Sequence, residues 1–298
     1  KAIRRQRQMC IRDRSATYQK RLKDFHFSIG GNMSHIQNKV NAIDPGMTGE
    51  TDRHISGNKI TTRNKPMNSY YMLKWTGKIY QTQEEVDNSP HVKGAGPGDL
   101  VFEDISGPEG KPDGVIDAND RQILGTEYPA WTFGANLSFG YKGINISADF
   151  QGIADAYTYG TCEYYTPTFQ GSNFGQYWTK RWTPEHPSET VPRLWVESGP
   201  NVDYSNSYFL MDRTYLRLKN LVLSYDLPLN IIRTLKMEKM RVYVSASNLF
   251  TWTKKDYRGL DPERSNGAGE RGGIPQAMTV KMLSLIHISE PTRPISIS

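Results

Sequence analysis

The chain has 298 residues, a formal net charge of +6 and a mean hydropathy of -0.64. This length allows one or two domains, and no run of apolar residues is long enough for a transmembrane helix. The low hydropathy is typical of soluble proteins, but transmembrane β-barrels are also polar on average because their inner face and loops are polar. Abundant Gly, Asn and Tyr with little helical periodicity favour an all-β fold.

Both ends of the chain have to be set aside before its charge is interpreted. Met9–Arg14 and Leu283–Ile288 can be encoded by opposite strands of one DNA element, which resembles the transposase adapter of sequencing libraries. We therefore predict that residues 1–14 and 283–298 are translated adapter, and that residues 15–282 are an internal gene fragment. The alternative is a natural basic arm and a disordered tail. If the adapter interpretation holds, both ends should lack sheet partners and pack little.

The interpretation of the net charge and of the cysteines changes once the two ends are left out. Residues 4–14 hold five Arg and one Asp, a net +4 of the formal +6. The remainder is nearly neutral, so the basic balance gives no evidence for nucleic-acid binding. Cys10 lies in the predicted adapter and Cys162 is then alone, so no intrachain disulfide is expected.

The first element to show the period of a strand begins near residue 25. Phe25, Phe27 and Ile29 alternate with polar residues, and the pattern runs towards Ile36. Residues 41–64 are polar and predict a loop or weak strands. A turn-rich segment then leads to a short strand that follows Gly98.

Residues 131–151 form the clearest predicted hairpin. Apolar and polar residues alternate on both sides of a tight turn at residues 141–143. Each strand is long enough for a tilted membrane crossing. A half-buried hairpin in a soluble sandwich fits the pattern alone equally well.

Residues 208–253 predict two strands joined by a short helix at residues 229–235. The apolar alternation of Leu216 and Leu218 shifts by one residue near Asn220. A β-bulge is the simplest cause of such a shift, because an extra residue exchanges the two faces of a strand. Both strands therefore suit a sheet with one apolar face.

Separate sequence blocks carry the most specific signal in the chain. They read Tyr215-Leu-Arg-Leu-Lys-Asn-Leu, Arg241-Val-Tyr-Val, Asn248-Leu-Phe-Thr-Trp-Thr, Gly259-Leu-Asp-Pro-Glu, Lys65-Pro-Met-Asn-Ser-Tyr-Tyr and Tyr177-Trp-Thr-Lys-Arg-Trp-Thr-Pro-Glu. Together they resemble the C-terminal part of SusC/RagA-type TonB-dependent outer-membrane transporters. Asn64 stands where that family usually has Gly, and Tyr80 where it has Phe. The resemblance covers about residues 20–282.

The resemblance implies an all-β fold, an antiparallel transmembrane β-barrel segment in the cell outer membrane. Barrels of this kind have short periplasmic turns and long extracellular loops. Residues 141–143 and 229–239, the second including the short helix, would then face the periplasm, and residues 86–128, 154–212 and 252–275 would face outward. Because large transporters have about 22 strands, the segment is incomplete and should form an open sheet.

The family also implies a function and partners. It implies TonB-dependent import of glycan or peptide fragments, with a SusD-like surface lipoprotein as lid and outer-membrane lipid around the barrel. TonB would supply energy through an N-terminal plug that this sequence does not contain. A secreted all-β carbohydrate-binding module and a calcium-stabilised surface adhesin domain are the alternatives. An upstream plug sequence would favour the importer, whereas a glycosidase or a stalk would favour the others.

No enzyme signature such as Gly-x-Ser-x-Gly, His-Glu-x-x-His, a P-loop or a Rossmann motif occurs, so we expect no enzymatic activity. The long loops are instead rich in aromatic residues. The candidates for stacking on sugar rings are Trp178, Trp182, Tyr164 and Tyr165. For any one of them, packing inside the loops or a place in an interfacial girdle is the stronger expectation.

Residues 104–121 contain a pattern that resembles the back half of an EF-hand-type calcium loop, in which carboxylates recur around a sharp Gly turn. The candidate calcium ligands are Asp104, Asp113, the Val115 carbonyl, Asp117 and Asp120. A metal-free turn, held by Asp side chains that accept from backbone N–H groups, competes with this hypothesis and is slightly favoured. In either case Ile116 should point inward and Gly114 should have a positive φ. No other cofactor is expected.

Overall fold

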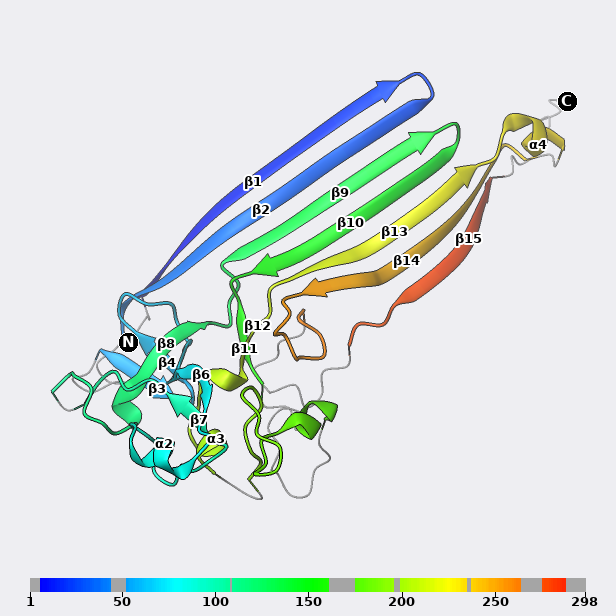
Figure 1. Ribbon diagram of the computed structural model, residues 1–298. Helices are drawn as coiled ribbons and strands as arrows, with labels where there is room; N and C mark the ends of the chain where they lie inside the picture. The colour runs from blue at the N-terminus through cyan, green and yellow to red at the C-terminus, as the bar shows by residue number, and fades with distance from the viewer. Residues whose placement is uncertain are drawn as a thin grey trace, which may run out of the picture.

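The computed structural model describes residues 6–43, 52–107, 109–160, 175–195, 199–234, 237–263 and 275–287. These residues form two parts, which Figure 1 shows at opposite ends of the view. One is a long antiparallel sheet. The other, here called the loop unit, consists of the described residues between the strands at one end of that sheet, in the ranges 43–130, 155–214 and 254–278.

The long sheet has seven strands in the order β1-β2-β9-β10-β13-β14-β15, with antiparallel neighbours. The strands are β1 (Gln6–Leu22), β2 (Phe25–Ala42), β9 (Trp131–Tyr141), β10 (Ile144–Ala154), β13 (Tyr215–Asp226), β14 (Lys239–Thr253) and β15 (Thr279–His287). Within the described ranges β1 and β15 each pair on one side only, so the sheet is open. The prediction of an all-β, open antiparallel sheet is confirmed.

The short connections of the long sheet lie at one of its ends and the long connections at the other. Tight turns join β1 to β2 and β9 to β10, and the short helix α4 (Leu229–Thr234) joins β13 to β14. These three lie at one end of the sheet, and the long connections lie at the other (Figure 1). The predicted grouping of short and long connections, and the predicted helix, are therefore confirmed.

The turn between β9 and β10 has the geometry of the tightest hairpins. Lys142 and Gly143 have φ angles of 44° and 86°, and a type I′ turn needs positive φ at both central residues. A Cβ on Gly143 would also lie 2.9 Å from the Asp226 carbonyl oxygen. Gly143 is therefore required both for its backbone angle and for the close approach of β13.

The predicted bulge in β13 is present at Lys219. On the β10 side Leu218 pairs with Phe150 and Asn220 with Asp149, so that Lys219 has no opposite residue. The register on the β14 side shifts at the same place. The extra residue restores the apolar side chains of the second half of β13 to the same face of the sheet as those of the first half.

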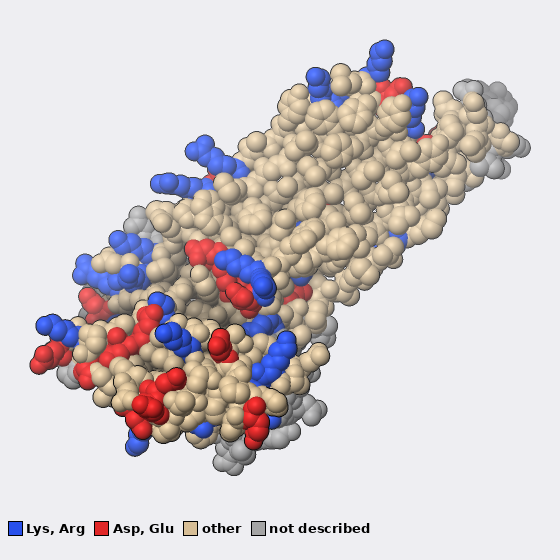
Figure 2. Space-filling view, viewed as in Figure 1, with Lys and Arg blue, Asp and Glu red and all other residues tan. Residues whose placement is uncertain are grey.

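The two faces of the long sheet differ in polarity. One face carries the apolar set and the other the polar set of each strand, because opposite residues in antiparallel pairs share a face. The apolar, outward set includes Leu137, Ile146, Leu223, Val244 and Phe250. Figure 2 shows few charged side chains over the middle of the sheet, whereas both signs of charge cover the loop unit.

Aromatic residues border the outward face at both ends of the strands. Phe25, Tyr141 and Tyr225 lie near the short turns, and Trp131 and Trp252 lie near the loop unit. The 11 residues of β9 separate the two rows. Ten steps of about 3.4 Å, tilted by about 40°, give a band about 26 Å tall, which matches the apolar band of outer-membrane barrels.

The prediction that the chain ends lack sheet partners is wrong. Arg7–Arg14 pairs with β2 and Leu283–His287 pairs with β14. The physical reason is that the edges of β2 and β14 offer unpaired N–H and C=O groups, and backbone hydrogen bonding accepts any extended segment. The expectation of little packing holds for the side chains of residues 9–14 and 283–286, which are exposed.

The side chains of these end segments do not follow the two-faced pattern of the sheet. Arg12 and Arg14 lie on the apolar face, opposite His35 and Met33. Met9 and Ile11 lie on the polar face, as do Leu283 and Leu285, which pair with Tyr243 and Arg241. In the segments predicted to be adapter, the alternation of apolar and polar side chains is thus the reverse of that in the rest of the sheet. The adapter origin itself stays a prediction.

The loop unit is built from short elements. A four-stranded sheet has the order β3 (Arg53–Ser56), β4 (Lys59–Thr62), β5 (Ser69–Leu73), β8 (Arg121–Thr126), and two pairs are β6 (Trp75–Ile79) with β7 (Leu100–Phe102) and β11 (Tyr157–Tyr159) with β12 (Leu210–Asp212). The helices are α2 (Gln83–Asp87), η1 (Ala118–Asp120), η2 (Gln176–Lys180), α3 (Pro200–Asp203) and η3 (Ser207–Phe209). No helix in the described ranges has the length and apolar character needed to cross a membrane.

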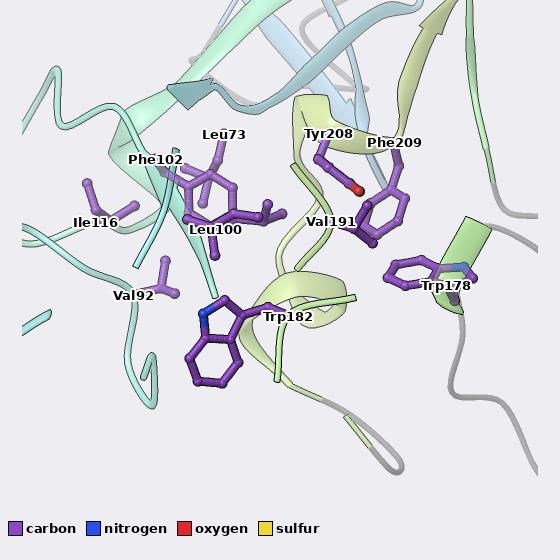
Figure 3. Packing of buried hydrophobic residues seen from close by; sticks show 11 residues of the cluster. Leu73, Val92, Leu100, Phe102, Ile116, Trp178, Trp182, Val191, Tyr208 and Phe209 are labelled. Carbon is purple, nitrogen blue, oxygen red and sulfur yellow. The ribbon is translucent and has the colours of Figure 1, made fainter. Parts of the chain in front are cut away.

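The loop unit has a hydrophobic core of its own. Figure 3 shows side chains from segments far apart in sequence converging on it, among them Leu73, Leu100, Phe102, Val191 and Phe209. All of these are almost fully buried. Burial of this kind is worth roughly 1.5–3 kcal/mol for each large apolar side chain, so the long connections hold one arrangement over the end of the sheet.

Candidate transport surface and loop anchors

The polar face of the long sheet carries a trough of about 780 Å³. An adjoining hollow of about 280 Å³ shares part of its lining. The polar side chains that line the trough are Asn32, Thr132, Asp149, Gln151, Lys219, Asn220, Ser247, Asn248 and Gln276. Most of these are amides or hydroxyls, which both donate and accept hydrogen bonds. The trough therefore suits a polar, largely uncharged ligand surface.

Glycine and asparagine alternate across the floor of the trough. Gly30 lies opposite Asn136, and Asn32 lies opposite Gly134. A Cβ on Gly30 would lie 2.1 Å from Asn136 Oδ1, and one on Gly134 would lie 3.0 Å from Asn32 Oδ1. Each Asn side chain thus lies over the opposite glycine. Because glycine has no side chain, space is left above the sheet here, and the amides line it with hydrogen-bonding groups.

A short segment of the last long loop is anchored to the polar face near the loop unit. We call residues 258–263 the strap. Arg217 on β13 donates to Asp261 Oδ1 and to Glu263 Oε2, each at 2.7 Å. Both ends of the pair with Asp261 are buried, with side chains 4% exposed. Paired guanidinium and carboxylate groups of this geometry are strong and directional.

Further hydrogen bonds complete the attachment of the strap. Lys219 Nζ donates to both carboxylate oxygens of Glu263, at 2.9 and 2.8 Å. The backbone N–H groups of Glu263 and Gln276 both donate to Asp261 at 2.9 Å. Burial raises the pKa of Asp261, but the hydrogen bonds from Gln276, Arg217 and Glu263 together outweigh it, so this pKa lies below its ordinary value.

The other end of the strap reaches into the loop unit. The Arg258 guanidinium lies 5.0 Å from the ring centre of Tyr177 and 4.8 Å from that of Tyr208. It also donates to the Tyr208 carbonyl oxygen at 2.5 Å, and the two phenol oxygens are 2.7 Å apart. Cation–π contacts of this kind stabilise by roughly 0.5–2 kcal/mol each. The strap therefore ties the loop unit to the sheet wall.

A buried carboxylate organises the interior of the loop unit. Asp99 is fully buried and accepts five hydrogen bonds. They come from the Gly96 N–H, Arg193 Nε, Arg193 Nη2, Trp195 Nε1 and Asn201 Nδ2, at 2.7–2.9 Å. A buried charge is tolerated when it is paired and its lone pairs are satisfied in this way. The cluster joins the turn at residues 96–99 to Arg193, Trp195 and Asn201, which follow Asp99 by 94 to 102 residues.

Trp178 and Trp182, two of the candidates for stacking on sugar rings, lie inside the loop unit, which agrees with the stronger expectation of packing within the loops. Their side chains are only 2% and 8% exposed, because they belong to the core of the loop unit. Trp182 Nε1 also donates to Gln81 Oε1 at 3.0 Å. Their ring faces pack against other apolar groups and are closed to a ligand. Tyr164 and Tyr165 lie outside the described residues.

The acidic loop has the geometry of a turn. Asp104 Oδ2 accepts from the Gly114 N–H at 2.9 Å, Asp113 Oδ1 from the Val115 N–H at 3.1 Å, and Asp117 Oδ1 from the Asn119 N–H at 2.6 Å. Asp120 accepts from the N–H groups of Ile105, Ser106 and Asp117.

In these contacts the carboxylates of the candidate calcium ligands accept from backbone N–H groups of the loop. In the described ranges no group of three or more His, Cys, Asp or Glu is arranged to hold a metal ion. Ile116 is buried and Gly114 has a φ of 83°, so both of those predictions are confirmed. Calcium binding itself stays a prediction, which calorimetry on the complete protein with an Asp113→Ala control would test.

Sequence reasoning missed the residues that carry the most contacts. Arg217 and Lys219 stand out in the sequence only as members of the block that begins at Tyr215, and Asp261 and Glu263 only as members of the block that begins at Gly259. Asp99 was not singled out, although a lone Asp in a Gly-Pro-Gly turn before an apolar strand was the available signal.

Comparison with known proteins gives consistent results. No protein-family model matches the sequence. The chain is 30% identical over 211 residues to TonB-dependent receptor P26 of Formosa agariphila, covering 68% of this chain and 20% of the receptor. It is 24% identical over 260 residues to TonB-dependent receptor SusC of Bacteroides thetaiotaomicron, covering 86% of this chain and 24% of that one. The chain thus spans less than a quarter of the length of these relatives.

Solved structures share the fold. The structure of the RagAB peptide transporter matches with a TM-score of 0.71 and 22% identity, over 94% of this chain and 29% of that one. The peptide importer in its closed-closed state matches with a TM-score of 0.67. The chain is therefore a segment of an outer-membrane β-barrel. It belongs with the TonB-dependent receptors of the SusC/RagA type.

Proposed function

We propose that this chain forms part of the wall and the outer loops of a transporter that imports glycan or peptide fragments across the outer membrane. One observation carries the proposal: the same seven strands present an apolar outward face and an amide-lined trough, and an anchored loop unit lies over one end. An apolar outward band suits lipid, and the trough suits a polar solute.

The orientation follows from the loops. Outer-membrane barrels have short periplasmic turns and longer extracellular loops, so the loop unit faces the outside and α4 faces the periplasm. We further propose that the complete protein takes energy from TonB and works with a SusD-like surface lipoprotein, which would contact the loop unit. We propose no enzymatic role for the chain.

The test uses the complete transporter that contains this segment, expressed in an outer membrane. Uptake of labelled oligosaccharides and peptides should be saturable, and it should stop when an uncoupler removes the inner-membrane proton gradient. Uptake that continues after uncoupling would indicate a passive pore. No uptake, together with an upstream gene that encodes a glycosidase or a stalk, would favour the binding-module or adhesin alternatives.

A further inference from the structure

Basic side chains gather at the long-loop end of β2, just beyond the aromatic border of the outward face. The His35 ring stacks on Trp131 with centroids 4.1 Å apart, which marks the border on β2 and β9. Lys39 follows on the same face of β2, four residues and so two periods of the strand alternation further from the band, and its side chain is exposed. It therefore lies at the height where a membrane interface would begin.

Three more cations come from the adjoining β3–β4 hairpin. Arg53 begins β3, and Arg63 and Lys65 follow β4. The hairpin is fixed beside Lys39, because the Val40 N–H donates to the Lys65 carbonyl oxygen at 3.0 Å and the Asn64 N–H donates to the Val40 carbonyl oxygen at 2.9 Å. We call Lys39, Arg53, Arg63 and Lys65 the basic patch.

The basic patch is exposed and poorly neutralised. All four side chains are classed as exposed, and within the described ranges the one acidic partner is Asp52, 3.9 Å from Arg63. Asp44 and Glu50 lie outside the described residues. Ile55 is 42% exposed and shares a face of β3 with Arg53. Cations beside an exposed apolar side chain are typical of membrane interfaces.

We propose that the basic patch binds the phosphate groups of lipid headgroups in the membrane leaflet at the long-loop end. Guanidinium and ammonium groups suit phosphate oxygens, and the patch is at the border of the apolar band rather than on top of the loop unit. The proposal concerns the lipid contact and is independent of what is transported.

The test measures lipid binding to the complete transporter in nanodiscs by native mass spectrometry. The probes are a bisphosphorylated glycolipid of the lipid A type and the same lipid after dephosphorylation. Since a basic residue at an anionic lipid surface is worth about 1 kcal/mol, replacing two should weaken binding of the phosphorylated lipid roughly 25-fold. We expect this loss for Lys39→Gln with Lys65→Gln, and separately for Arg53→Gln with Arg63→Gln.

The matched control is Lys93→Gln with Lys111→Gln, which removes two exposed cations elsewhere in the loop unit and should leave binding unchanged. Heat-modifiable migration on gels checks folding, and two independent pairs keep the test valid if one pair misfolds. Equal binding of the two lipids, or equal loss in the control, would overturn the proposal. Displacement of the lipid by millimolar inorganic phosphate would also overturn it, because it would indicate a free-anion site.

Discussion

The loop unit and the long sheet are stabilised in different ways. In the loop unit, apolar side chains from distant segments bury one another, and Asp99 joins two parts of the chain that are about a hundred residues apart. In the long sheet, one layer is held by its backbone ladder, and outward residues such as Phe250 and Met282 are more than half exposed. The hydrophobic effect in water can assemble the core of the loop unit, whereas the sheet needs lipid against its outward face and the rest of a barrel at its edges.

The largest effect is expected inside the loop unit, from Asp99→Asn. This change leaves Arg193 without its charged partner in a buried cluster, and breaking a buried pair costs about 3 to 5 kcal/mol. The rate of backbone amide hydrogen exchange in the complete transporter should rise around residues 92–102 and 191–201. It should change little in the long sheet. Asp87→Asn on the exposed side of α2 is the control, with an expected change below about 0.5 kcal/mol. Equal effects of the two variants would contradict this account of the core.

The second test compares neighbouring residues on opposite faces of β14. Ala246 faces outward opposite Leu221, and Ser245 faces the polar side. An arginine in the middle of the lipid face costs about 2 to 4 kcal/mol, whereas one on the inner face is tolerated better. Folding of the complete barrel into vesicles should therefore be impaired by Ala246→Arg much more than by Ser245→Arg. A similar cost for both would mean that the assignment of the faces is wrong.

The third test weakens the link between the two regions. Glu263→Gln keeps the shape of the strap but removes the charge that Arg217 and Lys219 share. Hydrogen bonds to charged groups contribute about 1.5 to 3 kcal/mol, so residues 254–263 should exchange faster while both regions stay folded. Glu189→Gln, an exposed carboxylate of the loop unit, should have no such effect. Unfolding of the loop unit in Glu263→Gln would show that the strap is part of its core.

The smallest effect is a dependence of the strap on pH. The pKa of Asp261 is lowered in the folded protein. A carboxyl group with a depressed folded pKa contributes stability above its unfolded pKa, and this contribution is lost as the pH falls through the folded pKa. After correction for the intrinsic pH dependence of amide exchange, the protection of residues 254–263 should thus be constant above about pH 5 and fall in more acidic solution. An Asp261→Asn variant should lose this dependence, and a variant that keeps it would assign the titration to another group.

Much of the long sheet could be predicted because its evidence is local. The hairpin at residues 131–151, the bulge near Asn220 and the helix after β13 follow from alternation and turn chemistry alone. The pairing order of the seven strands has no such local signal. It became accessible through the resemblance of whole sequence blocks to a family.

The loop unit was harder to predict because its contacts join distant positions. Asp99 accepts hydrogen bonds from Arg193 and Asn201, which follow it by about a hundred residues. No periodic pattern in the sequence predicts such a contact. The aromatic residues left two roles open for a physical reason: a Trp ring that suits a sugar face equally suits a hydrophobic core. Burial of Trp178 and Trp182 could be decided only once the loops were folded.

The ends of the chain remain open to a direct test. Their backbone pairing says nothing of their origin, but the reversed placement of Arg12 and Ile11 is unusual for a membrane strand. Peptide mass spectrometry of the native protein should recover peptides from residues 15–282 and none that contain residues 4–14 or 283–298. Recovery of either end from the native source would refute the adapter interpretation.

The hydrogen bonds that close the last long loop at the strap have a consequence for how the length of this loop can vary. Asp261 holds the N–H groups of Glu263 and Gln276 at the same carboxylate, so the two sides of the last long loop are fixed at its base. A loop closed in this way can change length at a cost that grows only slowly with the number of residues. A change of chain length between Glu263 and Gln276 should therefore leave the contacts of the strap with the barrel wall in place.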